Sequence, residues 1–210
     1  MANPFHYSKT KHIRTESPPA YSRYRKFKPH LRIEFSGRCV YCRALDRIKG
    51  PETFGVDHYR PQNHFPLLSA EYLNLYYACN LCNSRKSDFW PSSQLLKLGR
   101  FIPNPCDHVM FEHLRYKHGT VTSTSNAGEW TIEHLDLNDP EAVHWRETVI
   151  GVVDLLLAQI QKATSIVADA DKRLAAASTP AEKANAESLL DQAQQQLTKS
   201  SALLQNFADA

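Results

Sequence analysis

The pattern of apolar and polar positions predicts a helical C-terminal part that begins near residue 138. Apolar residues recur at helical spacing over residues 149–174 and again over residues 186–204. Two amphipathic helices separated by the short break Ser178-Thr179-Pro180 favour an antiparallel helical hairpin. We expect the hairpin over residues 138–210 to pack on the rest of the chain, to self-associate or to bind another protein.

Local signals mark the start of both helices. Asp139 precedes Pro140 and Glu141, which is typical of an N-cap with a proline in the first turn. Thr179 and Glu182 have the spacing of a capping box. These signals support the same two helices as the apolar pattern does.

The middle of the chain has shorter patterns. Thr120–Thr122 and Glu129–Ile132 contain β-prone residues, and Ser125–Gly128 between them has turn chemistry. We therefore expect a β-hairpin within residues 119–135. Near the N-terminus, residues 26–35 are expected to form a short helix.

Composition bounds the class of protein. A chain of 210 residues is long enough for one domain with a real core and an appendage. Its 42% hydrophobic and 22% charged residues are ordinary for a soluble globular protein. No apolar run predicts a membrane span, and residues 1–11 lack a secretory apolar core. We expect a cytoplasmic protein with no membrane partner.

Charge is concentrated at the N-terminal end, although the formal net charge is only +3. Residues 1–50 hold twelve Lys or Arg against three acids, whereas residues 151–210 hold five against seven. A basic arm over residues 1–35 suits a polyanionic partner. A solvated, disordered arm is the alternative, and the two are compatible because basic arms can order on nucleic acid.

Four of the five cysteines form two C-x-x-C pairs, Cys39 with Cys42 and Cys79 with Cys82. Two such pairs can place four thiolates around one Zn²⁺ as a closed, structural site. Buried cysteines without metal and a redox dithiol are the alternatives. The redox alternative needs a thioredoxin-like βαβ context, which this sequence lacks. Cys106 stands alone and is expected to be an ordinary half-buried residue.

Residues suited to phosphodiester cleavage lie between the two cysteine pairs and directly after the second pair. Asp57 and His58 lie between the pairs, and Asn83 directly follows Cys82. Histidine is a suitable general base near neutral pH, and a hard cation such as Mg²⁺ prefers carboxylate and amide oxygens. Adjacent residues face opposite sides of a strand, so we expect a strand to end near His58, before Pro61.

The order Cys-x-x-Cys, Val-Asp-His-x-x-Pro, Asn-Leu, Cys-x-x-Cys-Asn-x-x-Lys resembles the zinc-containing HNH endonucleases. The resemblance covers about Arg38 to Trp90. It implies an α+β fold: a small ββα-metal HNH core with a four-cysteine zinc knuckle pair, an additional β-hairpin and the C-terminal antiparallel helical hairpin. The nuclease domain would span residues 36–137. It also implies a structural Zn²⁺ and a catalytic Mg²⁺ or Mn²⁺.

The resemblance implies roles for individual residues. His58 matches the general base, Asp57 and Asn83 match ligands of the catalytic ion, and Asn74 matches the residue that braces the hairpin loop. Asn83 stands where the family usually has His and quite often has Asn. The nucleic-acid contacts would be Lys86, Arg60 and Arg85.

Structural alternatives exist for the same residues. His58 could cap a loop or join the zinc shell, Asn74 could be a turn amide, and Asn83 could be a helix N-cap. We expect His64 to be a surface residue. If Asp57, His58 and Asn83 have no catalytic role, the chain would be a non-catalytic zinc module that binds nucleic acid or a protein.

The C-terminal flank adds a looser resemblance. Phe101-Ile102-Pro103, the expected hairpin and Leu135-Asp136-Leu137-Asn138 resemble segments of bacterial anti-phage nucleases, including the HNH subunits of Septu-type systems and retron-linked relatives. This resemblance implies a role in defence and a partner ATPase. For the HNH nuclease itself, DNA is the first substrate to consider.

Overall fold

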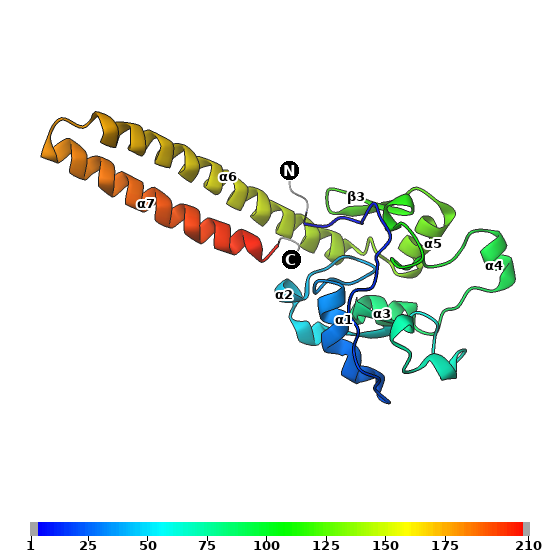
Figure 1. The fold of residues 1–210 in the computed structure, drawn as a ribbon. Coiled ribbons are helices and arrows are strands. Elements are labelled where there is room, and N and C mark those ends of the chain that lie inside the picture. Colours follow the sequence, from blue (N-terminus) through cyan, green and yellow to red (C-terminus); the bar gives the residue numbers. More distant parts are fainter. Residues whose placement is uncertain (1–3, 208–210) are drawn as a thin grey trace. The chain divides into compact units, whose positions relative to one another are not determined.

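The computed structural model describes residues 4–207, which fall into two compact units (Figure 1). One unit is Phe5–Glu147, and the other holds the residues from Thr148 onward. The elements in chain order are η1 (Tyr24–Phe27), α1 (Lys28–Glu34), α2 (Asp46–Lys49), η2 (Pro51–Thr53), β1 (Phe54–His58), η3 (Pro66–Leu68), η4 (Tyr72–Asn74), β2 (Leu75–Cys79), α3 (Asn80–Lys86), α4 (Ser93–Lys97), η5 (Met110–Glu112), β3 (Leu114–Lys117), β4 (Thr120–Ser123), α5 (Asn126–His134), α6 (Pro140–Ala176) and α7 (Pro180–Gln205).

The centre of the first unit is an antiparallel pair of strands followed by a helix. Phe54 of β1 lies opposite Cys79 of β2, and His58 lies opposite Leu75. Every residue of β2 is buried, and α3 begins directly after it and contacts both strands. This β1-β2-α3 arrangement confirms the mixed helix and strand fold with a ββα core that the sequence predicts.

The N-terminal segment is part of this unit. Phe5 and Tyr7 are buried, and the Tyr7 hydroxyl donates a hydrogen bond to the backbone oxygen of Tyr41. The Phe5 ring contacts Trp145 at 5.4 Å between ring centroids. From Phe5 on, the basic segment is therefore packed on the core, which removes the alternative of a wholly disordered arm.

A buried carboxylate fastens this segment to α1. Glu34 accepts hydrogen bonds from the backbone nitrogens of Thr15 and Glu16, from His12 and from the Tyr72 hydroxyl. Burial on its own would raise the pKa of Glu34, but these donors outweigh it and the pKa lies below its usual value. Glu34 is therefore ionised at neutral pH and holds the segment in place.

The prediction for residues 119–135 was half wrong. A β-hairpin exists, but β4 pairs with β3 upstream of it, with Leu114 opposite Ser123. Residues 129–132 lie in α5 instead of a strand. The physical reason is capping, because the Ser125 side chain accepts a hydrogen bond from the backbone nitrogen of Gly128 and starts a helix where a turn was expected.

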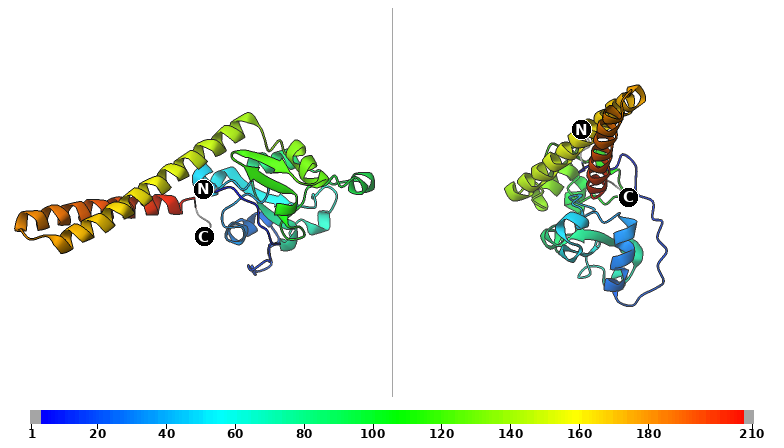
Figure 2. Two further views of the ribbon diagram at one scale, coloured as in Figure 1. Left: turned by 90° about the horizontal axis from the view of Figure 1, so that it is seen from above. Right: turned by 90° about the vertical axis from the view of Figure 1, so that its left-hand side faces the viewer.

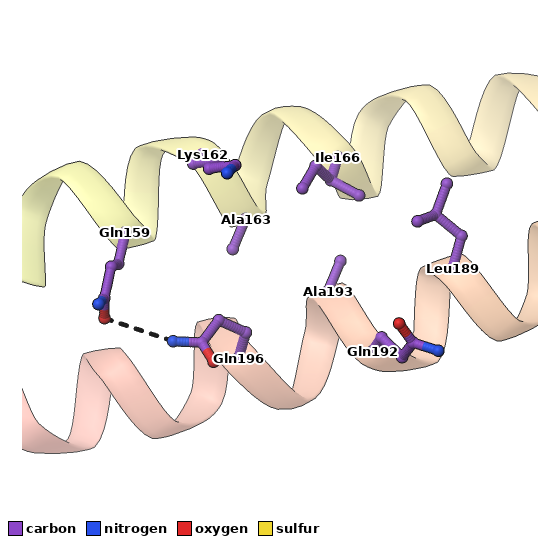
Figure 3. A pocket seen from close by; sticks show the side chains of 8 residues that line it. All are labelled: Gln159, Lys162, Ala163, Ile166, Leu189, Gln192, Ala193 and Gln196. Atoms are coloured by element: carbon purple, nitrogen blue, oxygen red, sulfur yellow. Dashed lines mark hydrogen bonds between the residues drawn. The ribbon is translucent and has the colours of Figure 1, made fainter.

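The predicted helical hairpin consists of α6 and α7, and it belongs to the second unit from Thr148 onward. The Asp139 carboxylate caps the start of α6, and Thr179 and Glu182 form a capping box at the start of α7. The two helices lie side by side in each view (Figures 1 and 2). Alanines fill their seam, and Figure 3 shows Ala163 and Ala193 pointing toward one another. Gln159 and Gln196 join the helices by a hydrogen bond of 3.3 Å.

The small residues at the seam leave little apolar area between the two helices. The groove beside Ala163 and Ala193 is open and has a volume of about 380 Å³. Helix α6 is also long and apolar enough to cross a membrane by length and composition, which the sequence pattern did not predict. Helices of soluble proteins pass the same test, so this is weak evidence for membrane contact.

We predict that Glu34→Gln lowers the free energy of unfolding at pH 7 by roughly 1–3 kcal/mol, because charge-assisted hydrogen bonds become neutral ones. A lowered pKa means that the contribution is full above the unfolded value and is lost as pH falls through the folded value. The difference between variant and wild type should therefore shrink in acid. Urea unfolding at neutral and acid pH measures it.

The control is Glu16→Gln, which removes the same charge from a partly exposed pair with His30. An equal loss of stability in both variants would contradict the role of Glu34.

Candidate active site

Two turns bring the four paired cysteines together. The turn that carries Cys39 and Cys42, the first knuckle, is closed by a hydrogen bond from the backbone nitrogen of Cys39 to the backbone oxygen of Ala44. A hydrogen bond from the backbone nitrogen of Val40 to the backbone oxygen of Tyr77 joins it to β2. The second knuckle lies where β2 ends and α3 begins, so Cys79 is both the last strand residue and the helix N-cap. The four cysteines thus lie in two turns, one before β1 and one at the junction of β2 and α3.

The cluster fits a tetrahedral metal. The sulfur atoms of Cys39, Cys42, Cys79 and Cys82 all lie within 4.8 Å of one another, and those of Cys42 and Cys79 are 3.7 Å apart. Zinc–sulfur bonds of about 2.3 Å give a tetrahedron with edges of roughly 3.8 Å. Burial raises the pKa of the Cys39 thiol, and a bound cation would stabilise its thiolate. The cluster is consistent with zinc.

The end of β1 places Asp57 and His58 at one cavity, although the two residues are adjacent in the chain. Asp57 is 1% exposed, whereas the His58 ring is half-buried and reaches an open cavity. The strand ends at His58, and the chain returns to β2 through residues 59–74. The carboxylate of Asp57 is therefore buried, whereas the imidazole of His58 is accessible from the cavity.

A backbone carbonyl fixes the tautomer of His58. Its Nε2 lies 2.9 Å from the backbone oxygen of Ser69, which can only accept a hydrogen bond. Nε2 therefore carries the hydrogen, and Nδ1 keeps a free lone pair. Burial lowers the pKa of His58 against the opposing effects of Ser69 and Asp57, so the neutral ring dominates at pH 7. A neutral ring with a free Nδ1 is what a general base requires.

The carboxylate of Asp57 is held from two sides. Its Oδ2 accepts from the Tyr41 hydroxyl at 2.6 Å, and its Oδ1 accepts from the Lys86 ammonium at 3.0 Å. Lys86 also donates to the backbone oxygen of His58 at 2.7 Å. Each carboxylate oxygen retains a second lone pair. The first zinc knuckle, β1 and α3 are thus joined at one side chain.

Asn83 lines the same cavity as Asp57 and His58. The cavity has a volume of about 230 Å³ and a mainly polar wall, completed by Pro61, Gln62, Asn63, Ser87 and Asp88. Asn83 lies within α3, whose N-cap is Cys79, so it is not a helix cap. Its Nδ2 faces the Val56 oxygen at 3.4 Å, which leaves Oδ1 available as a ligand atom. Asp57 and Asn83 thus offer oxygen ligands suited to a hard cation.

Asn74 braces the loop that leaves β1. Its Oδ1 accepts from the backbone nitrogen of Arg60, and its Nδ2 donates to the backbone oxygens of Arg60 and Leu68. Asn74 lies outside the cavity wall and is almost fully buried. Asn74 therefore contacts the loop and not the cavity.

The three expected nucleic-acid contacts lie in different surroundings. Lys86 is 1% exposed and is engaged with Asp57, so its ammonium faces the interior. Arg85 pairs with Asp136 and Asp139 and donates to the backbone at Leu135. Of the three, only Arg60 is exposed, and its guanidinium lies over the Phe65 and Trp90 rings.

Sequence reasoning missed several residues of the site. Tyr41 lies inside the first C-x-x-C pair, and an aromatic residue with a hydroxyl at that place was an available signal. Tyr24 contacts His58 with ring centroids 4.6 Å apart. Asp88 lines the cavity from the residue after Ser87, where the chain leaves α3. Ser69 acts through its backbone oxygen, for which no side-chain signal exists.

Comparison with known proteins identifies this region. Residues 39–89 match the sequence model of the HNH endonuclease family. The matched segment begins at the first zinc knuckle, contains β1, β2 and α3, and ends just after the cavity residue Asp88. No curated protein and no solved structure matches the chain.

We predict that the purified protein contains one zinc ion per chain and that Cys82→Ser loses it. The same variant should melt at a clearly lower temperature, because binding of a structural zinc is also folding energy. Elemental analysis and thermal unfolding measure both effects. Cys106→Ser is the matched control, because Cys106 lies outside the cluster. Unchanged zinc content in Cys82→Ser would refute the site.

We also predict that Lys86→Met lowers the free energy of unfolding by about 3–5 kcal/mol, because it leaves the buried carboxylate of Asp57 without its cation. Arg85→Met should cost only about 1 kcal/mol, since that pair is partly exposed to solvent. Urea unfolding of the zinc-loaded proteins compares the two neighbouring positions. Equal losses of unfolding free energy in Lys86→Met and Arg85→Met would contradict the predicted effect of burial.

Proposed function

Because residues 39–89 form an HNH endonuclease domain, we propose that the protein is a metal-dependent endonuclease that hydrolyses phosphodiester bonds of nucleic acid, DNA in the first place. One observation carries the proposal. His58, with Nδ1 free as a base, shares one cavity with the oxygen ligands Asp57 and Asn83. The cavity is open to solvent and therefore accessible to a phosphate group.

His58 takes the proton in the proposed reaction. A water molecule attacks the phosphorus, the bond to the departing sugar oxygen breaks, and Nδ1 of His58 accepts the proton of the water. The bond from Nε2 to Ser69 keeps the ring in place and gains strength as the ring becomes positive. Asn74 supports the loop that carries Arg60 and Leu68, so it positions the residues that follow His58.

Asp57 and Asn83 are the proposed ligands of the catalytic ion, Mg²⁺ or Mn²⁺. A bound divalent cation supplies charge neutralisation for the phosphate and the departing oxygen. Tyr41 and Lys86 hold Asp57 at the cavity wall, so this ligand is in place before substrate arrives. We propose Lys86 as a positioning residue, since its ammonium is already engaged in the interior.

The alternative is a non-catalytic zinc module that binds nucleic acid or a protein partner. The cysteine cluster and the basic N-terminal segment would suffice for it. The shared cavity of His58, Asp57 and Asn83 favours the nuclease, because a binding module has no use for an oriented imidazole beside two oxygen ligands.

A role in bacterial defence with a partner ATPase, and self-association through α6 and α7, extend this proposal. The first rests on the resemblance of residues 101–103 and 135–138 to anti-phage nucleases. The second rests on the small-residue seam and open groove of the helical hairpin. A cytoplasmic location goes with these roles.

We predict that His58→Ala lowers the rate of plasmid DNA cleavage by at least about 100-fold, the contribution of a general base. Zinc content and melting temperature should remain those of wild type. Cleavage is measured on gels with Mg²⁺ and with Mn²⁺. His64→Ala is the control, because His64 is an exposed histidine outside the cavity wall. Full cleavage by His58→Ala would contradict the proposal, and bound but uncut DNA with every divalent metal tested would favour the binding module.

A further inference from the structure

One turn of the N-terminal segment, helix η1, contacts the proposed general base. Helix η1 packs against β1, and its first residue, Tyr24, contacts the His58 ring edge to face at 4.6 Å between centroids. Tyr24 lies outside residues 39–89, so the family match does not cover it. The segment therefore brings a side chain from elsewhere in the chain to the proposed general base.

The next residue, Arg25, places a positive charge beside Tyr24. Arg25 donates from Nε to the Tyr24 hydroxyl at 3.4 Å, and its guanidinium lies 5.8 Å from the Tyr24 ring centroid. Arg25 is exposed and takes part in no ion pair among the residues that the structure describes. A guanidinium held by a neighbouring ring, yet free of carboxylates, is well prepared to bind phosphate.

The charge along this stretch of the chain has one sign. Arg23, Arg25 and Lys26 are exposed, and no acidic residue occurs between Glu16 and Glu34. Each nucleic-acid strand carries a phosphate about every 3.4 Å along the duplex axis, so a strand cut beside His58 continues past neighbouring side chains. Among these cations, only Arg25 is joined to the residue that touches His58.

We propose that η1 is part of the substrate-binding surface, in which Arg25 binds a backbone phosphate next to the one being cut and Tyr24 positions His58. This rests on the proposed function, because it takes the substrate to be a nucleic acid. It assigns a second, sequence-independent contact to the N-terminal segment. The partner is the phosphate backbone of the strand that enters the cavity.

The first test measures binding of a fluorescein-labelled DNA duplex by zinc-loaded protein without added catalytic cation, as a function of salt. Losing one phosphate contact reduces the slope of log K against log salt by about 0.9. We expect this reduction for Arg25→Gln. Lys26→Gln is the matched control, because it removes the same charge one residue away, from an ammonium that lies over Tyr21 instead. A wild-type slope for Arg25→Gln, or equal slopes for both variants, would overturn the phosphate contact.

The second test separates kcat from KM for Tyr24 variants. We expect Tyr24→Ala to lower kcat roughly 10- to 100-fold with little change in KM, as for a misplaced catalytic group. Tyr24→Phe keeps the ring against His58 and should retain the kcat of wild type. A lowered kcat in Tyr24→Phe, or full kcat in Tyr24→Ala, would overturn the positioning role.

The binding test also separates this proposal from the proposed function. Protein that binds the duplex with the expected dependence on Arg25, but cleaves no DNA, would leave the surface in place and refute the nuclease. Protein that cleaves DNA with a wild-type salt slope for Arg25→Gln would refute the surface and leave the nuclease in place.

Discussion

The buried carboxylate of Asp57 is the group on which the arrangement of the site depends. A charge at 1% exposure is costly unless partners compensate it, and here Tyr41 and Lys86 do so. Tyr41 belongs to the first zinc knuckle, and Lys86 lies at the end of α3, which starts at the second. The cysteine cluster and the cavity are therefore coupled, since each of the two knuckles leads to one of the partners of Asp57.

The same network explains how His58 is oriented. Lys86 holds the backbone at His58 while the Ser69 carbonyl holds its ring, so the imidazole is fixed from its main chain and its side chain. Asn74 fastens the intervening loop through Arg60 and Leu68. The candidate site is thus built on a short strand and a helix, with a braced loop between them.

The sequence predicted the parts of the fold that follow local rules. Cysteine spacing indicated the metal cluster, and capping residues located the starts of α6 and α7. The order of Asp57, His58 and Asn83 indicated which residues meet in the cavity. The error at residues 129–132 came from the same local reasoning, because β-prone residues there were overruled by the N-cap at Ser125.

Long-range packing supplied what local patterns could not. Nothing in the composition of residues 1–35 distinguishes a solvated arm from a segment fastened by Glu34 and carrying Tyr24 to His58. Likewise, Lys86 looks like a surface cation on a helix, and only its distance to Asp57 reveals a buried ion pair. In both cases the charge is visible in the sequence, while its partner is decided by the fold.

We propose that Asp57 and Asn83 hold a catalytic cation beside His58 while the cysteines hold zinc. The decisive measurement is a crystal structure with added Mn²⁺, recorded at wavelengths that separate manganese from zinc by anomalous scattering. We expect a manganese peak in contact with oxygens of Asp57 and Asn83 and a zinc peak among the four sulfurs. Manganese bound elsewhere, with Asp57 contacted only by Tyr41 and Lys86, would contradict it.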